Sequence, residues 1–328
     1  MIRRPPRSTH CISSAASDVY KRQIHNNDFK FRFQKISESM TKTTDPVAIN
    51  DWQVIGRIDD FLKDQPKQTR LLGQSLVAER HKNGDIKVHE ISELGETLRS
   101  CPVQEKFGHV WTTLGKPERE LFDIPEFLQI DRKYVGCGGV MVKASALRVV
   151  ENFLDIGHFP YVHTDFLGSE PLTEVKDYKA EIRIDVDEVW ADEISFHQDK
   201  AMLSATGGKA VEYMYRVVSP FNTVLYKTCP EKPEEWDIIG LFAQPLEENL
   251  CRVYAFMLVF DSQNTETDLI HFQQMIFFQD IIILENQLPV GVPLYDGAER
   301  SIKADKTQLQ FRKWLKQKGL QFGTDQET

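Results

Sequence analysis

The chain has 328 residues, of which 41% are hydrophobic, and a formal net charge of −9 at pH 7. Its length suits one large domain or two modest ones, and its acidic balance gives no indication of nucleic acid or an anionic membrane as partner. No apolar run approaches the ~20 residues that span a bilayer. Five scattered cysteines argue against a disulfide framework, so we expect a cytoplasmic protein.

The first 22 residues, MIRRPPRSTHCISSAASDVYKR, differ from the rest. They are basic and rich in serine, as some targeting peptides are, but they lack a clear amphipathic face. They also resemble translated adapter sequence. We therefore expect residues 1–39 to be adapter-derived or disordered, with Met40 as the native start.

From Trp52 onward the pattern is that of a globular protein. Short β-branched and aromatic runs predict strands, with a turn at Asn83-Gly84, and a polar linker follows at 116–130. A later block of similar runs predicts an antiparallel sheet. The predicted strand regions are 51–61, 69–91, 103–115, 178–196, 210–228, 237–246 and 251–260.

Three helices are predicted from apolar residues at helical spacing. The first runs from about Ser145 to Asp155 and ends near Gly157. The second covers about 267–287, and the third, about 305–318, ends at Gly319.

Asp280 interrupts the apolar helical run MIFFQDIIILENQ. Its neighbours at three and four residues, Ile276, Phe277, Ile283 and Leu284, mark a buried face. A carboxylate there is costly unless it is paired or bound to a metal. Taken alone, a buried salt bridge or a carboxylate that caps backbone groups explains it better.

His158 and His163 lie five residues apart in ENFLDIGHFPYVH. That spacing cannot place both on one face of a straight helix. Gly157 and Pro160 break the helix, so the chain can turn and direct both imidazoles at one point. Two histidines alone are weak evidence for a metal site. Together with Asp280 they match the two-His, one-carboxylate ligand set of non-haem Fe(II) oxygenases.

The arrangement D-x-x-H-x-x-x-x-H, followed by the distant FFQDIIILENQ, resembles the catalytic domain of Rieske-type non-haem iron aromatic-ring-hydroxylating oxygenase α subunits. Segments 51–61 and 69–86 resemble the opening strands of that family, and 102–115 resembles the strand that closes its Rieske domain. Residues 292–320 are similar to its C-terminal segment.

The resemblance implies an α+β fold. An antiparallel helix-grip (START-like) catalytic domain at 131–328 would follow a small, truncated Rieske-like β domain at 40–130. His158, His163 and Asp280 would bind mononuclear Fe(II), with O₂ as co-substrate. The implied reaction is hydroxylation or oxidative demethylation of a small aromatic or heteroaromatic compound.

The resemblance also implies a role for Asp155, which we place on the helical face of His158. In the family, this aspartate links the iron site to a Rieske histidine of the neighbouring subunit of a trimer. Ile156, Phe159 and Phe277 are candidates for the substrate wall.

The chain departs from the family at the iron–sulfur cluster. A Rieske centre needs Cys-x-His and Cys-x-x-His pairs, and the sequence contains neither. The cluster-bearing hairpins would fall between about Val88 and Cys101, where VHEISELGETLRSCPVQ joins the flanking strands directly. We therefore expect no [2Fe–2S] cluster in this chain and electrons from a Rieske- and flavin-containing reductase, within a trimer or hetero-oligomer.

Three explanations compete for the missing pairs. The deletion is natural, as in the similar cluster-less subunits of methylxanthine N-demethylation, or the gene model has lost a segment of a complete Rieske oxygenase. Alternatively, the chain is a non-catalytic structural subunit. The complete His158, His163 and Asp280 set weighs against the last explanation.

Overall fold

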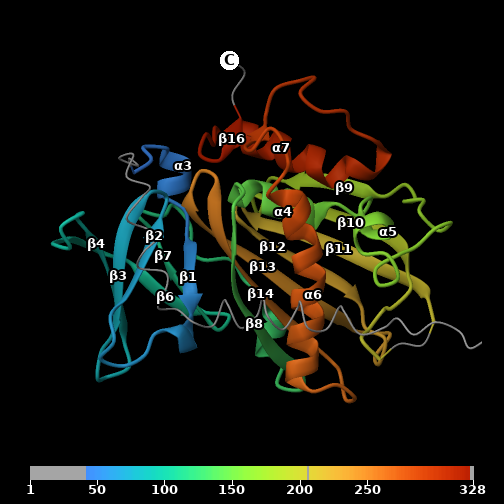
Figure 1. Cartoon of the computed structure of the whole chain (residues 1–328), viewed down its shortest axis with the longest axis horizontal. Helices are drawn as coiled ribbons and strands as arrows, with labels where there is room; N and C mark the ends of the chain where they lie inside the picture. Colours follow the sequence, from blue (N-terminus) through green and yellow to red (C-terminus); the bar gives the residue numbers. More distant parts are fainter. Residues whose placement is uncertain (1–41, 205–206, 326–328) are drawn as a thin grey trace, which may run out of the picture. The chain divides into compact units, whose positions relative to one another are not determined.

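The structure is a computed structural model, which describes residues 42–204 and 207–325 (Figure 1). The expectations about residues 1–39 and Met40 concern segments outside the described residues. Among the described helices, none is both long and apolar enough to cross a membrane.

Two small antiparallel sheets form the first part of the described chain. The three-stranded sheet has the order β1-β7-β6, with strands at Gln53–Arg57 (β1), Val103–Lys106 (β6) and His109–Thr112 (β7). The four-stranded sheet has the order β2-β3-β4-β5, with strands at Lys67–Leu71, Gln74–Arg80, Ile86–Ile91 and Thr97–Cys101. The predicted turn at Asn83-Gly84 is confirmed, with Gly84 at a φ of 96°.

The prediction of a single strand over 103–115 is wrong, because β6 and β7 form a hairpin there. Phe107 and Gly108 have φ values of 55° and 71°, so both central residues of the turn are left-handed. A two-residue turn of this hand matches the twist of paired strands. Gly108 is required at this position, since a Cβ would overlap the side chain of Tyr134.

A seven-stranded antiparallel sheet dominates the rest of the chain, as the sequence predicted. Its order is β8-β14-β13-β12-β11-β10-β9. The strands are Lys133–Val142 (β8), Lys179–Arg183 (β9), Glu188–Gln198 (β10), Lys209–Ser219 (β11), Asn222–Thr228 (β12), Trp236–Glu247 (β13) and Leu250–Val259 (β14). Strand β8 was not predicted, because a shift in its pairing with β14 and the left-handed Gly138 (φ 80°) interrupt its alternation.

The three predicted helices are confirmed with small shifts at their ends. They are α4 (Ala146–Leu154), α6 (Glu266–Leu284) and α7 (Lys306–Lys318). Thr265 caps α6 in a reciprocal arrangement with Asp268, and Gly319 ends α7 in the left-handed conformation. Contacts of α4 with β13 and β14, of α6 with β8, and of α7 with β9 and β10 place the helices against the large sheet (Figure 1).

The two faces of the large sheet pack against different partners. One face carries alternate residues of β11, such as Val211 and Tyr213, into the main core. The other face packs against the three-stranded sheet through aromatic side chains, with Trp111 and Phe242 ring centroids 4.8 Å apart. His109 is buried among these rings, and burial lowers its pKa to about 4.

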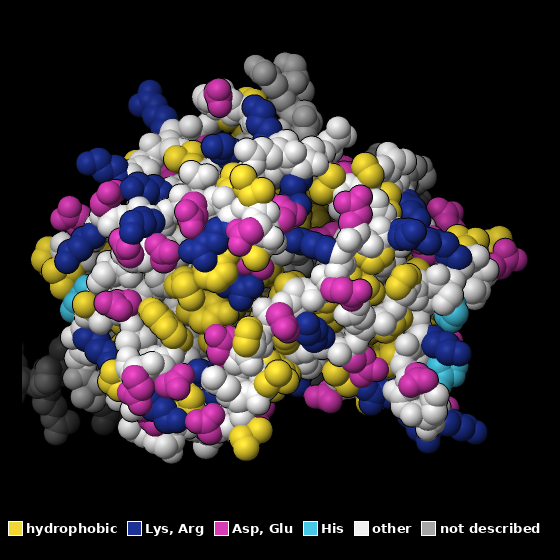
Figure 2. All heavy atoms as spheres, turned by 180° about the vertical axis from the view of Figure 1, so that it is seen from behind, with side chains coloured by type: hydrophobic (Ala, Val, Ile, Leu, Met, Phe, Trp, Pro, Cys, Tyr) yellow, Lys and Arg dark blue, Asp and Glu magenta, His cyan; other side chains and the backbone are white. Residues whose placement is uncertain are grey.

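Figure 2 shows the surface from behind the view of Figure 1. Lysine and arginine side chains alternate there with aspartate and glutamate, with hydrophobic side chains between them. Because charges of both signs are interspersed, their fields partly cancel on this face.

Asp45 joins the beginning and the end of the described chain. Its Oδ1 accepts the backbone N–H of Val47 at 2.9 Å and caps the short helix α3 (Pro46–Ile49). Its Oδ2 accepts the N–H groups of Gln321 and Phe322 at 2.7 and 2.8 Å. Asp45 is buried, so the three donors would lose their acceptor if this side chain were truncated.

We predict that Asp45→Ala lowers the free energy of unfolding by about 1–3 kcal/mol, because the buried N–H of Phe322 loses its acceptor. The N–H groups of Val47 and Gln321 are only partly buried and add less. Asp45→Asn keeps one acceptor oxygen and should lose less. Urea denaturation followed by circular dichroism measures the effect. Asp185→Ala, at an exposed position, is the control. Equal losses for the two alanine variants would contradict the prediction.

Candidate active site

His158 and His163 stand at the two ends of the short helix α5 (Phe159–Val162). Helix α4 ends at Leu154, and the chain turns through Gly157 before α5 begins. Pro160 occupies the first turn of α5, where a missing N–H is tolerated. The predicted turn is therefore present, and it brings the two Nε2 atoms to 3.1 Å from each other.

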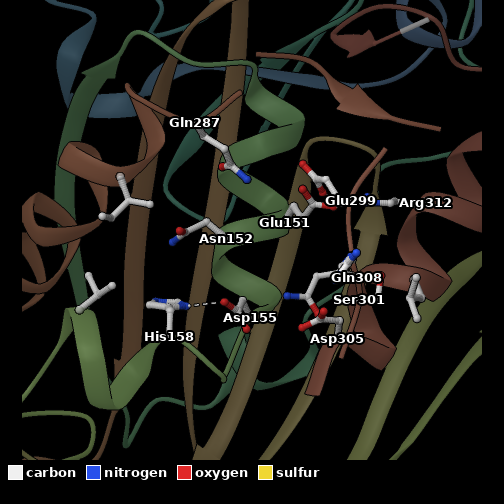
Figure 3. Close-up of a pocket in the computed structure, with 14 residues that line it drawn as sticks. Glu151, Asn152, Asp155, His158, Gln287, Glu299, Ser301, Asp305, Gln308 and Arg312 are labelled. Carbon is white, nitrogen blue, oxygen red and sulfur yellow. Dashed lines mark hydrogen bonds and ion pairs between the residues drawn. The ribbon is translucent and has the colours of Figure 1, made fainter. Parts of the chain in front are cut away.

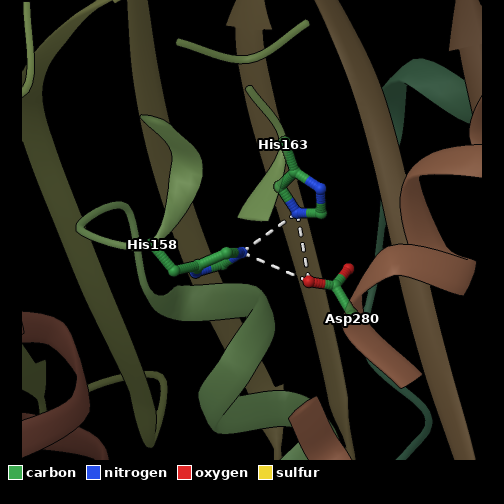
Figure 4. Close-up of side chains that lie close together, drawn as sticks. All are labelled: His158, His163 and Asp280. Atoms are coloured by element: carbon green, nitrogen blue, oxygen red, sulfur yellow. Dashed lines mark hydrogen bonds and ion pairs between the residues drawn. The ribbon is translucent and has the colours of Figure 1, made fainter. Parts of the chain in front are cut away.

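Asp280 of α6 completes a triangle with the two histidines (Figure 4). Its Oδ1 lies 3.3 Å from His158 Nε2 and 3.0 Å from His163 Nε2. Asp280 and His163 are buried, and the His158 side chain is 14% exposed. The structure therefore brings together the three residues that the sequence singled out.

The buried face of α6 is narrower than predicted. Ile276 and Leu284 are buried on either side of Asp280, as expected. Ile283 is 48% exposed, so its predicted place on the buried face is wrong. With about 3.6 residues per turn, positions four apart form the buried stripe, and position 283 falls on its solvent side.

Each imidazole has an oxygen partner at Nδ1. His158 Nδ1 lies 3.1 Å from Asp155 Oδ2, and His163 Nδ1 donates to Gln279 Oε1 at 2.8 Å. These acceptors hold the ring proton on Nδ1, so the Nε2 lone pair of a neutral imidazole is directed at Asp280. Three electron-pair donors thus meet, and they repel one another unless a cation lies among them.

The pKa values of Asp280 and His158 also indicate that the triangle favours a positive charge. Burial raises the pKa of Asp280, but the two adjoining imidazoles outweigh burial and lower it to about 2. Burial lowers the pKa of His158, but Asp155 and Asp280 outweigh burial and raise it to about 9. A proton or a metal ion would satisfy this preference.

The triangle fits a metal ion. Adjacent ligands of an octahedral ion, at bond lengths of about 2.1 Å, are about 3.0 Å apart, and the triangle has sides of 3.0, 3.1 and 3.3 Å. Asp280 Oδ1 is buried and makes no hydrogen bond to any described residue. Two neutral imidazoles with one carboxylate are the donor set of non-haem Fe(II) sites, so these residues could hold iron.

Asp155 reaches His158 by a different route from the predicted one. Helix α4 ends at Leu154, and Asp155 has an extended backbone with φ −85° and ψ 121°. The prediction that Asp155 and His158 share one helical face is therefore wrong. The contact is made across the following loop, where Gly157 N–H donates to Asp155 Oδ1 at 2.8 Å. Burial raises the pKa of Asp155, but the hydrogen bond with His158 outweighs it and lowers the pKa.

Asp155 and His158 also line a polar pocket (Figure 3). Side chains of α4, of the segment 299–305 and of α7 surround this pocket. Its polar lining includes Glu151, Asn152, Glu299, Asp305 and Arg312. His158 therefore borders this pocket as well as the triangle.

A second, largely apolar cavity reaches all three residues of the triangle. Its volume is about 100 Å³. Phe159 and Phe277 line it as predicted, whereas Ile156 is not a wall residue and packs in the main core. Further apolar wall residues are Phe153, Leu167, Leu225, Ile239, Leu241 and Ile276.

Gln279, Tyr213 and Tyr215 are among the polar residues of the site that were not predicted. Gln279 orients His163, and its position next to Asp280 was the available signal. Tyr213 and Tyr215 line the apolar cavity. Their spacing of two places them on one face of a strand, but a strand alone does not tell which face meets a cavity.

Comparisons with known proteins identify the family of the chain. The family model of the vanillate O-demethylase oxygenase C-terminal domain matches residues 142–320. The probable methylxanthine N7-demethylase NdmC of Pseudomonas sp. (strain TJI-51) is 37% identical over 277 residues, which are 84% of this chain and 96% of that protein. Methylxanthine N3-demethylase NdmB of Pseudomonas putida is 24% identical over 68% of this chain and 61% of that protein.

Solved structures share the fold. NdmA of Pseudomonas putida CBB5 has a TM-score of 0.65 at 15% identity, over 81% of this chain and 89% of that chain. Dicamba monooxygenase bound to 3,6-dichlorosalicylic acid has a TM-score of 0.66 at 15% identity, over 83% of this chain and 97% of that chain.

The matched region includes His158, His163 and Asp280, within a fold of mostly antiparallel sheets. The fold and the family model define the class as a Rieske-type oxygenase, an oxidoreductase. The chain belongs to the vanillate O-demethylase oxygenase family within that class. The resemblance inferred from the sequence is thereby confirmed.

Proposed function

We propose that this protein is the oxygenase component of an oxidative demethylase that removes an N-methyl group from a small heteroaromatic compound of the methylxanthine type. The convergence of His158, His163 and Asp280 at an apolar cavity carries the proposal. The names of the related demethylases support the substrate class. Hydroxylation of another small aromatic compound is the alternative outcome of the same chemistry.

In this proposal His158, His163 and Asp280 hold one Fe(II). Iron bound there supplies the activation of O₂ that a C–H hydroxylation needs. Overall, the N-methyl group, O₂, two electrons and two protons yield an N-hydroxymethyl group and water. The N-hydroxymethyl group then loses formaldehyde and leaves N–H. The apolar walls, Phe159 and Phe277 among them, hold the substrate and exclude water.

The two electrons must come from another protein if this chain has no cluster. The sequence lacks both Cys/His pairs of a Rieske centre, so we propose a Rieske- and flavin-containing reductase as partner, in a trimer or hetero-oligomer. The polar pocket beside Asp155 is the proposed docking point. Asp155 already contacts His158 and is placed to accept a hydrogen bond from an incoming histidine.

The same proposal assigns the two small sheets to a Rieske-like domain. Residues 40–130 would be a Rieske-like domain shortened between Val88 and Cys101, and 131–328 the helix-grip catalytic domain. Two features support it. Val88 pairs directly with Cys101 through the β4–β5 hairpin, and α6 packs on the seven-stranded sheet.

We predict that alanine at His158, His163 or Asp280 lowers the iron content from about one per chain to less than about a tenth, because each change removes one ligand. Metal analysis after anaerobic Fe(II) reconstitution measures it. Asp280→Ala should leave the apoprotein folded, because Asp280 contacts the two imidazoles and does not carry the main packing of α6. His271→Ala, exposed on the same helix, is the control and should keep its iron. Wild-type iron in all three variants would refute the ligand set, and an iron-free wild type would favour a structural subunit.

Gln279→Leu should weaken metal binding about 10- to 100-fold, because it removes the acceptor that orients His163. Gln279→Glu keeps an acceptor and should bind metal nearly as well as the wild type. Titration with Co(II) against a competing chelator measures the affinities. Gln273→Leu is the control, since Gln273 is on the same helix and lines the apolar cavity without a hydrogen bond to either histidine. Unchanged affinity in Gln279→Leu would show that the hydrogen bond does not position the ring.

Asp155→Asn should keep its iron, because Asp155 contacts a histidine and not the centre of the triangle. It should lose most multiple-turnover activity, since the amide is a weaker acceptor for the partner's histidine. The assay compares product from the chain alone, with a flavin reductase, and with a Rieske-containing reductase. Asp185→Asn, at an exposed position, is the control. Full turnover with the flavin reductase alone, or wild-type rates in Asp155→Asn, would exclude this route.

A further inference from the structure

Two tyrosines of the apolar cavity have hydroxyl groups without a hydrogen-bond partner among the residues that the structure describes. Tyr213 and Tyr215 are two residues apart on β11, so both side chains face the cavity. They are 2% and 1% exposed, and neither hydroxyl makes a hydrogen bond to a residue in 42–204 or 207–325. Most buried hydroxyls in proteins have a hydrogen-bond partner, so two unpaired hydroxyls in one cavity indicate a functional role.

Lys227, a cationic residue that lines the cavity, forms no hydrogen bond with either hydroxyl. Lys227 pairs with Tyr213 across β11 and β12, but its Nζ donates to Ala201 O at 2.6 Å and to Gln198 Oε1 at 3.3 Å. The amine is thus directed at the end of β10 and the loop beyond it. Both phenol hydroxyls therefore stay without a hydrogen-bond partner among the described residues.

The tyrosines lie about one aromatic ring away from the triangle. The Phe159 ring centroid is 6.3 Å from that of Tyr213 and 5.1 Å from that of His158. The Tyr213 and Tyr215 rings are nearly parallel, at 15°, with centroids 6.5 Å apart. Both side chains thus belong to one wall of the cavity, and a planar ligand whose methyl group reaches the triangle can present another edge to that wall.

Both phenols act as donors at neutral pH. Burial raises the pKa of Tyr213 and of Tyr215 far above the ordinary value for tyrosine. The protonated hydroxyl can donate to an oxygen on the ligand, and a phenolate is disfavoured. An apolar cavity with a few placed donors is the usual form of a site that fixes ligand orientation.

We propose that Tyr213 and Tyr215 are substrate-binding residues whose hydroxyls donate hydrogen bonds to ring carbonyl oxygens of the substrate and turn its N-methyl group toward His158, His163 and Asp280. The inference rests on the proposed function, since methylxanthines carry two ring carbonyls beside their N-methyl groups. It adds that the cavity selects for carbonyl-bearing rings. A site built to hydrogen-bond a ligand rejects the analogue that lacks the partner group, because its own polar groups then stay unpaired.

The test uses the purified full chain and isothermal titration calorimetry with two probes, caffeine and 7-methylpurine. The second has the same ring system and an N-methyl group but no carbonyl. The wild type should bind caffeine at least about tenfold more tightly. Tyr213→Phe and Tyr215→Phe should each weaken caffeine binding about five- to tenfold and leave 7-methylpurine binding unchanged.

Thermal unfolding separates a binding role from a structural one. Neither hydroxyl has a hydrogen-bond partner in the described part of the chain, so the two phenylalanine variants should unfold at the wild-type temperature or above it. Tyr178→Phe is the matched control, because its buried hydroxyl donates to Ala304 O at 2.6 Å and accepts from Thr307 N at 3.1 Å. That variant should unfold at a lower temperature and bind caffeine as the wild type does.

Selective loss of caffeine affinity in the tyrosine variants supports the proposal. Unchanged caffeine binding, equal losses for both probes, or a wild-type chain that binds neither probe overturns it. Failure of the proposed function has a different signature. An iron-loaded chain that still discriminates caffeine from 7-methylpurine, but releases no formaldehyde with any reductase, would refute demethylation and leave the tyrosine assignment standing.

Discussion

The mutual repulsion of three electron-pair donors is the constraint around which this protein is built. Two imidazole nitrogens and one carboxylate oxygen lie within 3.3 Å of one another in a largely buried place. Only a rigid frame keeps such groups together before a cation arrives. Asp155 and Gln279 fix the two rings, and the capped helix α6 fixes the carboxylate. The helices that carry the three donors are in turn held by the large sheet.

The large sheet can serve as this frame because both of its faces are covered. On the outer face, the aromatic cluster around Trp111 and Phe242 joins it to the three-stranded sheet. Gly240 permits this packing, since a Cβ there would overlap the ring of Phe256. The inner face is then free to combine core residues with a cavity wall. Tyr213 and Tyr215 belong to that wall, on a strand paired on both sides.

Local signals in the sequence were sufficient for the helices, for the antiparallel sheet and for the triangle. Gly157 and Pro160 indicate the turn that brings the two histidines together, and Asp280 is a charged residue within an apolar run. The predictions from sequence failed where tertiary packing determines the end of a helix or the face that it buries. The end of α4 at Leu154 moved Asp155 off the expected helical face, and the packing direction of α6 exposed Ile283. The partners of Gln279 and the cavity-facing tyrosines depend on contacts between distant segments, which periodicity does not reveal.

The origin of the three donors has a consequence for biosynthesis. The two histidines are neighbours in the chain, whereas the carboxylate comes from α6, in which Gln279 contacts His163 across 116 residues of sequence. Strands β9 to β14 lie between them in the chain. A ribosome must therefore release the whole large sheet and α6 before the third donor can reach the other two. Any metal held there is acquired after the fold has closed, so its capture can report completed folding but cannot nucleate it.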